Sequence, residues 1–231
     1  MKIFGLQKMT LLDFPGHVAC TVFLSGCGLR CPFCHNFDLA LGRAPAVMEE
    51  EELMAFLSRR RGLLDGVAIS GGEPCLHGDL PRLMRDIRAL GFKVKLDTNG
   101  CHPALLARIL SEGLADYVAM DIKNSPEKYA VTCGLSEMDL SPVRESVSLL
   151  MSGGVPYEFR TTVVREFHEE KDFAAIGEWI RGAGAYFLQP FVDRDAVPFS
   201  GLHAPDKEQL RLFAAAAGRF VRSVRVRGEE I

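Results

Sequence analysis

The sequence of 231 residues lacks several features that would place it in large classes of protein. No apolar run approaches the roughly 20 residues of a membrane-spanning helix, and residues 1–6 lack the apolar core of a signal peptide. The formal net charge of -3 provides no basic surface for a polynucleotide. We therefore expect a cytoplasmic protein that acts on neither a membrane nor a nucleic acid.

The chain also lacks internal repeats, low-complexity tracts and proline-rich linkers that would mark a boundary between domains. With 48% hydrophobic residues, 22 Gly and 12 Pro, it has the composition of a globular protein. It is long enough for one sizeable core and too short for two large ones. We expect residues 1–231 to form one domain.

Short apolar runs alternate with amphipathic stretches, which predicts an α/β fold with a parallel sheet and outer helices. The expected strands are residues 18–24, 66–70, 92–97, 117–121, 157–163 and 185–189. The expected helices are residues 49–61, 79–90, 103–112, 141–151, 172–183 and 206–222. A further strand-like run at 221–226 is expected to close one edge of the sheet.

The cysteine pattern is the most informative feature that the sequence does contain. Cys27, Cys31 and Cys34 follow the first expected strand, and no fourth cysteine follows at the spacing of a ferredoxin. Three thiolates can hold three irons of a 4Fe–4S cluster and leave the fourth iron open. A cluster with an open iron can bind a ligand and direct an electron into it. These residues therefore predict a reaction site.

Two other interpretations of the cysteines are weaker. A structural zinc site usually needs four ligands in two pairs, and no second Cys-x-x-Cys or His-x-x-x-His follows. A disulfide framework is disfavoured because seven cysteines is an odd number and no signal peptide precedes them. Cys75 and Cys101 follow later motifs directly, and we interpret both as incidental thiols rather than as ligands of a second cluster.

The spacing of the three cysteines, with Phe33 before the last, resembles the signature of the radical S-adenosylmethionine (radical SAM) enzymes. The resemblance implies a partial (β/α)6 barrel with its site at the C-terminal ends of the strands. It also implies one 4Fe–4S cluster per chain and S-adenosylmethionine as cofactors. In that family the open iron is chelated by the amino and carboxylate groups of S-adenosylmethionine, which is cleaved reductively to methionine and a 5'-deoxyadenosyl radical.

Glycine-rich and polar segments follow the expected strands, where the loops of such a barrel would build the site. In Gly71-Gly72-Glu73-Pro74 the glycines allow backbone to approach a ligand closely. Glu73 can accept a hydrogen bond from an ammonium group. The segment resembles the family's Gly-Gly-Glu-Pro motif, which implies that it binds the methionyl amino group.

Three more of the expected strands contain or end in candidate cofactor contacts. Thr98 and Asn99 follow the third strand, in a sequence that alone would simply be a good turn. Asp121 and Lys123 should point the same way, and a similar Asp-x-Lys contacts S-adenosylmethionine in glycyl-radical activating enzymes. Arg160 lies in an apolar strand and needs an anion when buried, either the ligand carboxylate or an Asp or Glu of the chain.

Residues around the cysteines narrow the resemblance. Residues 8–16, 23–27 and 34–36 resemble the activating proteins of anaerobic ribonucleoside-triphosphate reductase, and the likeness runs from about Gly5 to Gln189. Gln189 departs from the pattern, because some activating enzymes carry a histidine there that contacts the cofactor. The resemblance implies that a hydrogen is abstracted from a glycine of a large partner enzyme. It also implies a flavodoxin- or ferredoxin-type electron donor.

Alternatives to this partner stay open at the level of the sequence. Activators of other glycyl-radical enzymes share the same core. A short radical SAM enzyme can also act on a small molecule, as in deazapurine biosynthesis. A non-catalytic electron carrier is a third possibility, but it would leave the motifs at Glu73 and Lys123 without a purpose.

Overall fold

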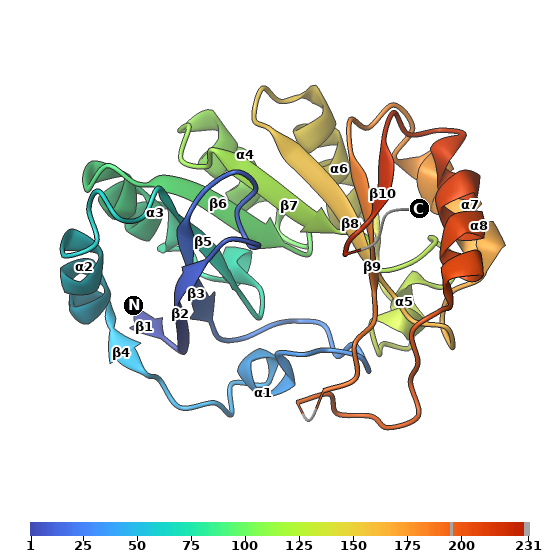
Figure 1. The fold of residues 1–231 in the computed structure, drawn as a ribbon, viewed down its shortest axis with the longest axis horizontal. Coiled ribbons are helices and arrows are strands. Elements are labelled where there is room, and N and C mark those ends of the chain that lie inside the picture. The colour runs from blue at the N-terminus through green and yellow to red at the C-terminus, as the bar shows by residue number, and fades with distance from the viewer. Residues whose placement is uncertain (195, 229–231) are drawn as a thin grey trace.

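The computed structural model describes residues 1–194 and 196–228, and most of its strands form one eight-stranded sheet (Figure 1). The strand order is β10-β9-β8-β7-β6-β5-β3-β2. Neighbouring strands are parallel except at one edge, where β2 runs antiparallel to β3. Among the described residues, β10 and β2 each pair with one neighbour only, so the sheet is open rather than a closed barrel.

The elements have the following bounds. The strands are β1 (Lys2–Ile3), β2 (Gly5–Thr10), β3 (Ala19–Leu24), β4 (Met48–Glu49), β5 (Gly66–Gly71), β6 (Lys93–Thr98), β7 (Tyr117–Asp121), β8 (Tyr157–Val163), β9 (Tyr186–Pro190) and β10 (Val224–Val226). The helices are α1 (Phe37–Ala40), α2 (Glu50–Ser58), the 3₁₀ turn η1 (Pro74–Leu76), α3 (Leu80–Ala89), α4 (Pro103–Ser111), α5 (Tyr129–Thr132), α6 (Ser141–Ser152), α7 (Glu170–Trp179) and α8 (Lys207–Gly218).

The predicted α/β fold with a parallel sheet and outer helices is confirmed. The six expected strands are β3 and β5 to β9, and the run at 221–226 contains the edge strand β10. Several of these strands are found because parallel strands are buried on both faces and read as nearly continuous apolar runs, whereas β6 and β8 alternate apolar and polar residues. In β5, for example, Val67, Ala68 and Ile69 are all fully buried.

The largest error in the predicted elements concerns helix α7. The sequence predicts a start at Asp172 and an end at 183, whereas the helix spans Glu170–Trp179. Asp172 is the third residue of the helix and completes a capping box, because its side chain accepts a hydrogen bond from the backbone N–H of Glu169, the residue before the helix. The edge strand β2 is also missed, because its sequence Gly-Leu-Gln-Lys-Met-Thr lacks the continuous apolar run of the buried strands.

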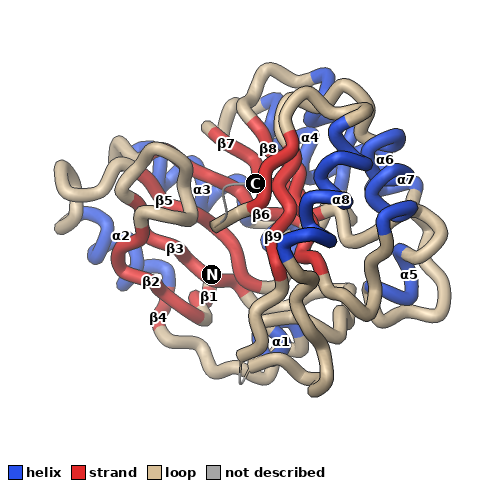
Figure 2. The backbone as a smooth tube through the Cα atoms, turned by 45° about the vertical axis from the view of Figure 1, so that its right-hand side comes forward, coloured by secondary structure: helices blue, strands red, loops and turns tan. Residues whose placement is uncertain are grey.

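The C-terminal ends of the parallel strands meet at one edge of the sheet. Helix α1 and the chain that follows β9 both run past this edge, along the lower side of the view in Figure 1 and again in Figure 2. His35, just before α1, joins the two segments, because its Nε2 lies 2.6 Å from the carbonyl oxygen of Val192. Loops from both ends of the chain therefore border the same edge.

No helix among the described residues is long and apolar enough to cross a membrane.

A partly buried ion pair joins the start of helix α2 to helix α3 and to the N-terminus. Glu50, at the start of α2, is 7% exposed and receives two hydrogen bonds from the Arg82 guanidinium of α3, at 2.5 and 2.7 Å. The N-terminal ammonium of Met1 lies 2.7 Å from the same carboxylate. The hydrogen bonds from Arg82, more than its charge, lower the pKa of Glu50 from 4.5 to about 2.

This pair predicts a pH-dependent stability. Because the pKa of Glu50 is lower in the folded state, its contribution is complete above pH 4.5 and is lost as the pH falls through about 2. Arg82 is half exposed, so we expect about 2 kcal/mol rather than the full linkage value. Urea unfolding at pH 7 and at pH 2.5 should show Glu50→Gln destabilised at pH 7, with much less difference at pH 2.5. The exposed neighbour Glu51→Gln is the control, and an equal loss at both pH values would contradict the linkage.

Candidate active site

The three cysteines lie in the loop between β3 and α1. The loop leaves β3 through Gly26, whose φ of +90° favours glycine. Its backbone is tied to α1, because the N–H of Gly26 donates to Leu39 at 2.8 Å and the N–H of Cys27 donates to Ala40 at 3.0 Å. The N–H of Cys34 donates to the carbonyl of Cys31 at 3.1 Å. These bonds fix the backbone of the loop, and all three cysteines line one cavity.

The thiols have different surroundings. Cys27 Sγ accepts hydrogen bonds from the N–H of Leu29 at 3.3 Å and from Nδ2 of Asn99 at 3.6 Å. Burial nevertheless raises the pKa of Cys27 to about 11, and burial also raises that of Cys34. A hydrogen bond from the thiol of Cys133 lowers the pKa of Cys31 to about 7.

Gly71 and Gly72 pack against the backbone of the cysteine loop. A Cβ on Gly71, where φ is +120°, would lie 2.2 Å from the carbonyl oxygen of Leu24. A Cβ on Gly72 would lie 2.1 Å from the carbonyl oxygen of Gly26. Both glycines also line the cavity. The close backbone approach expected of this motif is therefore made to Leu24 at the end of β3 and to Gly26 of the cysteine loop.

The carboxylate of Glu73 lies behind the cavity wall. Glu73 is 1% exposed and accepts hydrogen bonds from the N–H of Cys75 at 2.9 Å, the hydroxyl of Thr98 at 2.7 Å and the N–H of Asn99 at 2.6 Å. Neither Glu73 nor Pro74 is among the residues that line the cavity, whereas Thr98 and Asn99 are. The ligand contact of Glu73 stays a prediction; in the structure its carboxylate positions Thr98 and Asn99, the two residues of the wall.

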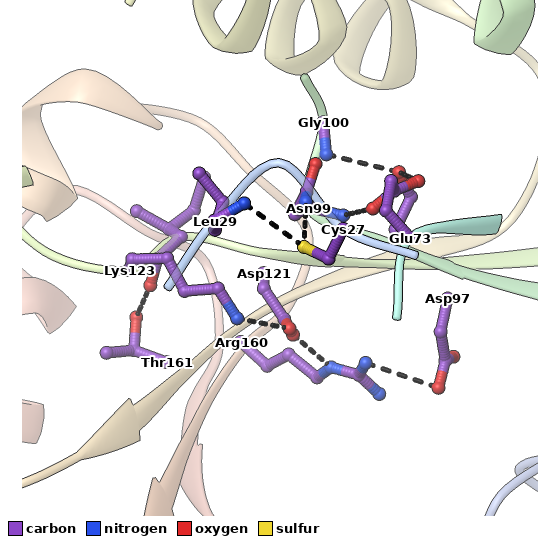
Figure 3. Close-up of polar contacts among 12 residues, drawn as sticks. Cys27, Leu29, Glu73, Asp97, Asn99, Gly100, Asp121, Lys123, Arg160 and Thr161 are labelled. Atoms are coloured by element: carbon purple, nitrogen blue, oxygen red, sulfur yellow. Dashed lines mark hydrogen bonds and ion pairs between the residues drawn. The ribbon is translucent and has the colours of Figure 1, made fainter. Parts of the chain in front are cut away.

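A row of alternating charges crosses the strand ends β6, β7 and β8 (Figure 3). Lys95 pairs with Asp97, and Asp97 lies 3.2 Å from the guanidinium of Arg160. Arg160 donates from Nε to Asp121 at 2.5 Å, and Asp121 accepts from Lys123 at 2.8 Å. Three cations and two carboxylates leave this row with one net positive charge. Asp121 and Lys123 thus point the same way, as the alternation predicted.

The row keeps its members charged. Burial disfavours ionisation of Asp121, but the positive charges of Arg160 and Lys123 outweigh it and hold its pKa well below the usual range. The pKa of Asp97 is lowered in the same way, against burial, by Arg160 and Lys95. The carboxylates in turn raise the pKa of Lys123 and Arg160 despite their burial. Arg160 is therefore paired with two Asp residues of the chain.

The cavity brings together most of the residues that the sequence proposed. Its lining includes Cys27, Cys31, Phe33, Cys34, Gly71, Gly72, Thr98, Asn99, Asp121, Lys123 and Arg160. It also includes His35, which the sequence suggests orients the cysteine loop, and residues for which no role was predicted: Leu29, Asn36, Ala40, Ser70, Asp97 and Thr162. The sequence could have indicated Asp97, because Lys95 and Asp97 are alternate residues of one strand and their side chains should lie on the same face of the sheet. Gln189 does not line the cavity.

Cys75 and Cys101 lie outside this cavity. Both line a separate depression beside η1 and α4. Within the described ranges, no three His, Cys, Asp or Glu side chains converge on one point as ligands of a single metal ion would.

The fold and the site have known counterparts. The model of the radical SAM superfamily matches residues 21–180, a span that contains the three cysteines and the strand ends that line the cavity. The protein belongs to the radical SAM superfamily. A 4Fe–4S cluster and S-adenosylmethionine are the cofactors of this family.

Similar proteins define a family within the superfamily. A candidate glycyl-radical enzyme activating enzyme of Methanocaldococcus jannaschii is 30% identical over 97% of this chain and 95% of its own. A pyruvate formate-lyase-activating enzyme of Listeria monocytogenes is 31% identical over 91% of this chain and 93% of its own. A 7-carboxy-7-deazaguanine synthase of Hyperthermus butylicus is 40% identical over 39% of this chain and 38% of its own. The chain is an enzyme of the glycyl-radical activating family.

Among solved structures, Streptococcus suis SuiB bound to the precursor peptide SuiA matches with a TM-score of 0.70 and 13% identity. The match covers 90% of this chain and 48% of SuiB, so the chain spans about half the length of that protein. At this identity the likeness shows the fold alone.

Proposed function

We propose that the protein holds one 4Fe–4S cluster on Cys27, Cys31 and Cys34 and binds S-adenosylmethionine beside it. We further propose that it abstracts a hydrogen from a glycine of anaerobic ribonucleoside-triphosphate reductase. The observation that carries the proposal is that the three cysteines line the same cavity as Asp97, Asp121, Lys123 and Arg160 of the charged row. The proposal also includes a flavodoxin- or ferredoxin-type electron donor, a cytoplasmic location and one domain over residues 1–231.

The donor set fits the cluster. Three thiols of one short loop provide soft sulfur ligands, the type that iron–sulfur clusters require. The N–H groups of Leu29 and Asn99 point at Cys27 Sγ, and such donors stabilise thiolate charge. No fourth protein thiol is assigned, so one iron stays available to S-adenosylmethionine.

The opposite wall fits the charged end of S-adenosylmethionine. Lys123 and Arg160 offer N–H donors for a carboxylate, and Asp121 offers acceptors for an ammonium group. The net positive charge of the row favours the anionic group. The cavity volume is about 170 Å³, below the roughly 300 Å³ at which pockets for drug-sized ligands begin. We therefore assign to it only the cluster and the amino-acid end of the ligand.

The protein's own residues supply position and charge rather than proton transfer. When bound, the cluster and S-adenosylmethionine supply reductive cleavage and a carbon-centred radical. Glu73 holds Thr98 and Asn99 in the wall beside Cys27. Asp121 accepts a hydrogen bond from Lys123 with one carboxylate oxygen and from Arg160 with the other, which orients both side chains. Hydrogen abstraction by a carbon radical needs no general base, and we assign none.

The partner is tested by electron paramagnetic resonance. The reconstituted protein is mixed anaerobically with reductant, S-adenosylmethionine and the anaerobic reductase of the same organism. We expect a glycyl-type doublet on the reductase, and no doublet when its candidate glycine is replaced by Ala. Deoxyadenosine without a protein radical would overturn the proposed partner and retain the radical SAM assignment. No deoxyadenosine from a fully loaded cluster would overturn the proposed cofactor site.

Two other substrates have an observation in their favour. The likeness to pyruvate formate-lyase-activating enzymes extends over 91% of the chain, so pyruvate formate-lyase is the second protein to test in the same spectrum. The likeness to 7-carboxy-7-deazaguanine synthase is limited to 39% of the chain and favours a small-molecule substrate less. Deoxyadenosine that forms only with a deazaguanine precursor would select this alternative.

A further inference from the structure

His168 connects the loop after β8 to the loop after β7. It lies between β8 and α7 and is 3% exposed. Its Nε2 lies 2.9 Å from the carbonyl oxygen of Lys123, and its Nδ1 lies 3.2 Å from the backbone nitrogen of Val164. Lys123 belongs to the charged row and lines the cavity, whereas His168 is not among the lining residues. A buried side chain outside the cavity therefore contacts the backbone of a residue in its wall.

The contacts of the imidazole ring determine its tautomer. Burial lowers the pKa of His168, so the ring is neutral at pH 7, with one N–H donor and one acceptor nitrogen. With the proton on Nε2, the ring donates to the carbonyl of Lys123 and accepts from the N–H of Val164. The other tautomer could donate to the carbonyl oxygen of Val164 at 3.1 Å, but it would place two acceptors 2.9 Å apart at Lys123. His168 is therefore the donor to Lys123.

The chain on both sides of Lys123 is also bonded to β8 and to the loop that follows it. The hydroxyl of Thr161 donates to the carbonyl oxygen of Ile122 at 2.6 Å (Figure 3). Nδ2 of Asn124, which is fully buried, donates to the carbonyl oxygen of Phe167 at 3.0 Å. Three consecutive residues beyond β7 are thus each bonded to this one segment. Because β7 ends just before these residues, the bonds determine the path of the chain there.

The ammonium group of Lys123 depends on this backbone because its side chain is a flexible four-carbon stem. Its Nζ donates to one carboxylate oxygen of Asp121 at 2.8 Å, while Arg160 donates to the other oxygen at 2.5 Å. A shift of the Lys123 backbone would draw the ammonium group away from Asp121. It would also move the ammonium group relative to the cavity that Lys123 lines.

We propose that His168 is a positioning residue for Lys123, whose Nε2–H holds the Lys123 carbonyl and so places the ammonium group for the carboxylate of S-adenosylmethionine. The inference rests on the proposed function, because it requires that Lys123 binds this ligand. The loss of one neutral hydrogen bond of this kind corresponds to about a fivefold change in an equilibrium constant.

The test is the Kd for S-adenosylmethionine, measured by calorimetry on the reconstituted protein, with iron per chain and urea unfolding recorded for each variant. The amide nitrogen of Gln can take the place of Nε2, whereas the shorter amide of Asn reaches only the place of Nδ1. His168→Gln should therefore keep the wild-type Kd, and His168→Asn should raise the Kd about fivefold with iron unchanged. His102→Asn is the control, because His102 is a half-buried histidine outside the cavity lining, and it should leave the Kd unchanged.

A double-mutant cycle shows whether His168 acts through Lys123. Lys123→Met should raise the Kd, and His168→Asn should add little to it in that background, because the ammonium group that it positions is gone. A full fivefold effect of His168→Asn in the Lys123→Met protein would overturn the inference. So would equal Kd values for His168→Gln and His168→Asn, or loss of iron from both.

The same measurements separate this inference from the proposed function. If Lys123→Met weakens binding and His168→Asn does not, the inference alone is wrong. If Lys123→Met binds S-adenosylmethionine with the wild-type Kd, the proposed role of Lys123 is wrong and the inference fails with it.

Discussion

Replacing Cys27, Cys31 or Cys34 with Ala is expected to reduce cleavage of S-adenosylmethionine below detection. A cluster held by three thiolates loses a third of its protein ligands in each variant, and no other described Cys lines the cavity to replace it. The electron then has no route into the ligand. Methionine and deoxyadenosine, measured by chromatography after reduction with dithionite, report the loss, and iron per chain reports whether any cluster remains.

Cys101→Ala is the matched control for these variants. Cys101 is a half-buried cysteine of the same chain, but it lines the separate depression beside α4 rather than the cavity. It should retain iron and cleavage. A variant of Cys27, Cys31 or Cys34 that cleaves at the wild-type rate would remove that residue from the ligand set.

Arg160→Met should weaken both folding and cofactor binding. Arg160 is 13% exposed on its side chain and lies between Asp97 and Asp121. Removing one partner of a buried ion pair leaves uncompensated charge, which costs about 3–5 kcal/mol. Lys95 and Lys123 still pair with the two carboxylates, so we expect a loss of about 3 kcal/mol in urea unfolding. The row changes from a net charge of +1 to 0, and the Kd for S-adenosylmethionine should rise at least tenfold by calorimetry.

Two further variants separate charge from geometry. Arg160→Lys keeps the positive charge but cannot bridge both carboxylates, so its affinity should lie between those of wild type and Arg160→Met. Arg165→Met, just beyond β8, removes a half-exposed arginine that is 3.7 Å from Glu166, and should change neither quantity. Wild-type affinity in Arg160→Met would show that the arginine is only structural.

The elements that the sequence predicted well are those with a strong local signal. Strands β3, β5 and β7 are mostly apolar because they are buried on both faces, and β6 and β8 alternate apolar with polar residues; both patterns are visible in the sequence. The edge strand β2 and the single-turn helix α5 have no such pattern and were missed, whereas the edge strand β10 lies within the run predicted at 221–226.

The hydrogen-bond partners of Glu73 could not be predicted from the residues next to it in the sequence. Its place after two glycines made it a candidate for a ligand contact. Three donors from Cys75, Thr98 and Asn99 bind the carboxylate within the chain. Two of these donors come from another strand end, and nothing in the spacing of the residues indicates that the loops approach so closely.

The amino-acid sequence alone was enough to predict the class of cofactor, the order of the buried strands along the chain and the edge of the sheet at which the candidate site lies. These follow from ligand type, from the period of apolar residues and from the rule that parallel strands end together. The partners of Glu73, the charged row through Arg160 and the backbone hydrogen bond between Arg30 and Cys133 required the folded chain. They join residues that are distant in sequence, and such pairings depend on how the strand ends and loops pack.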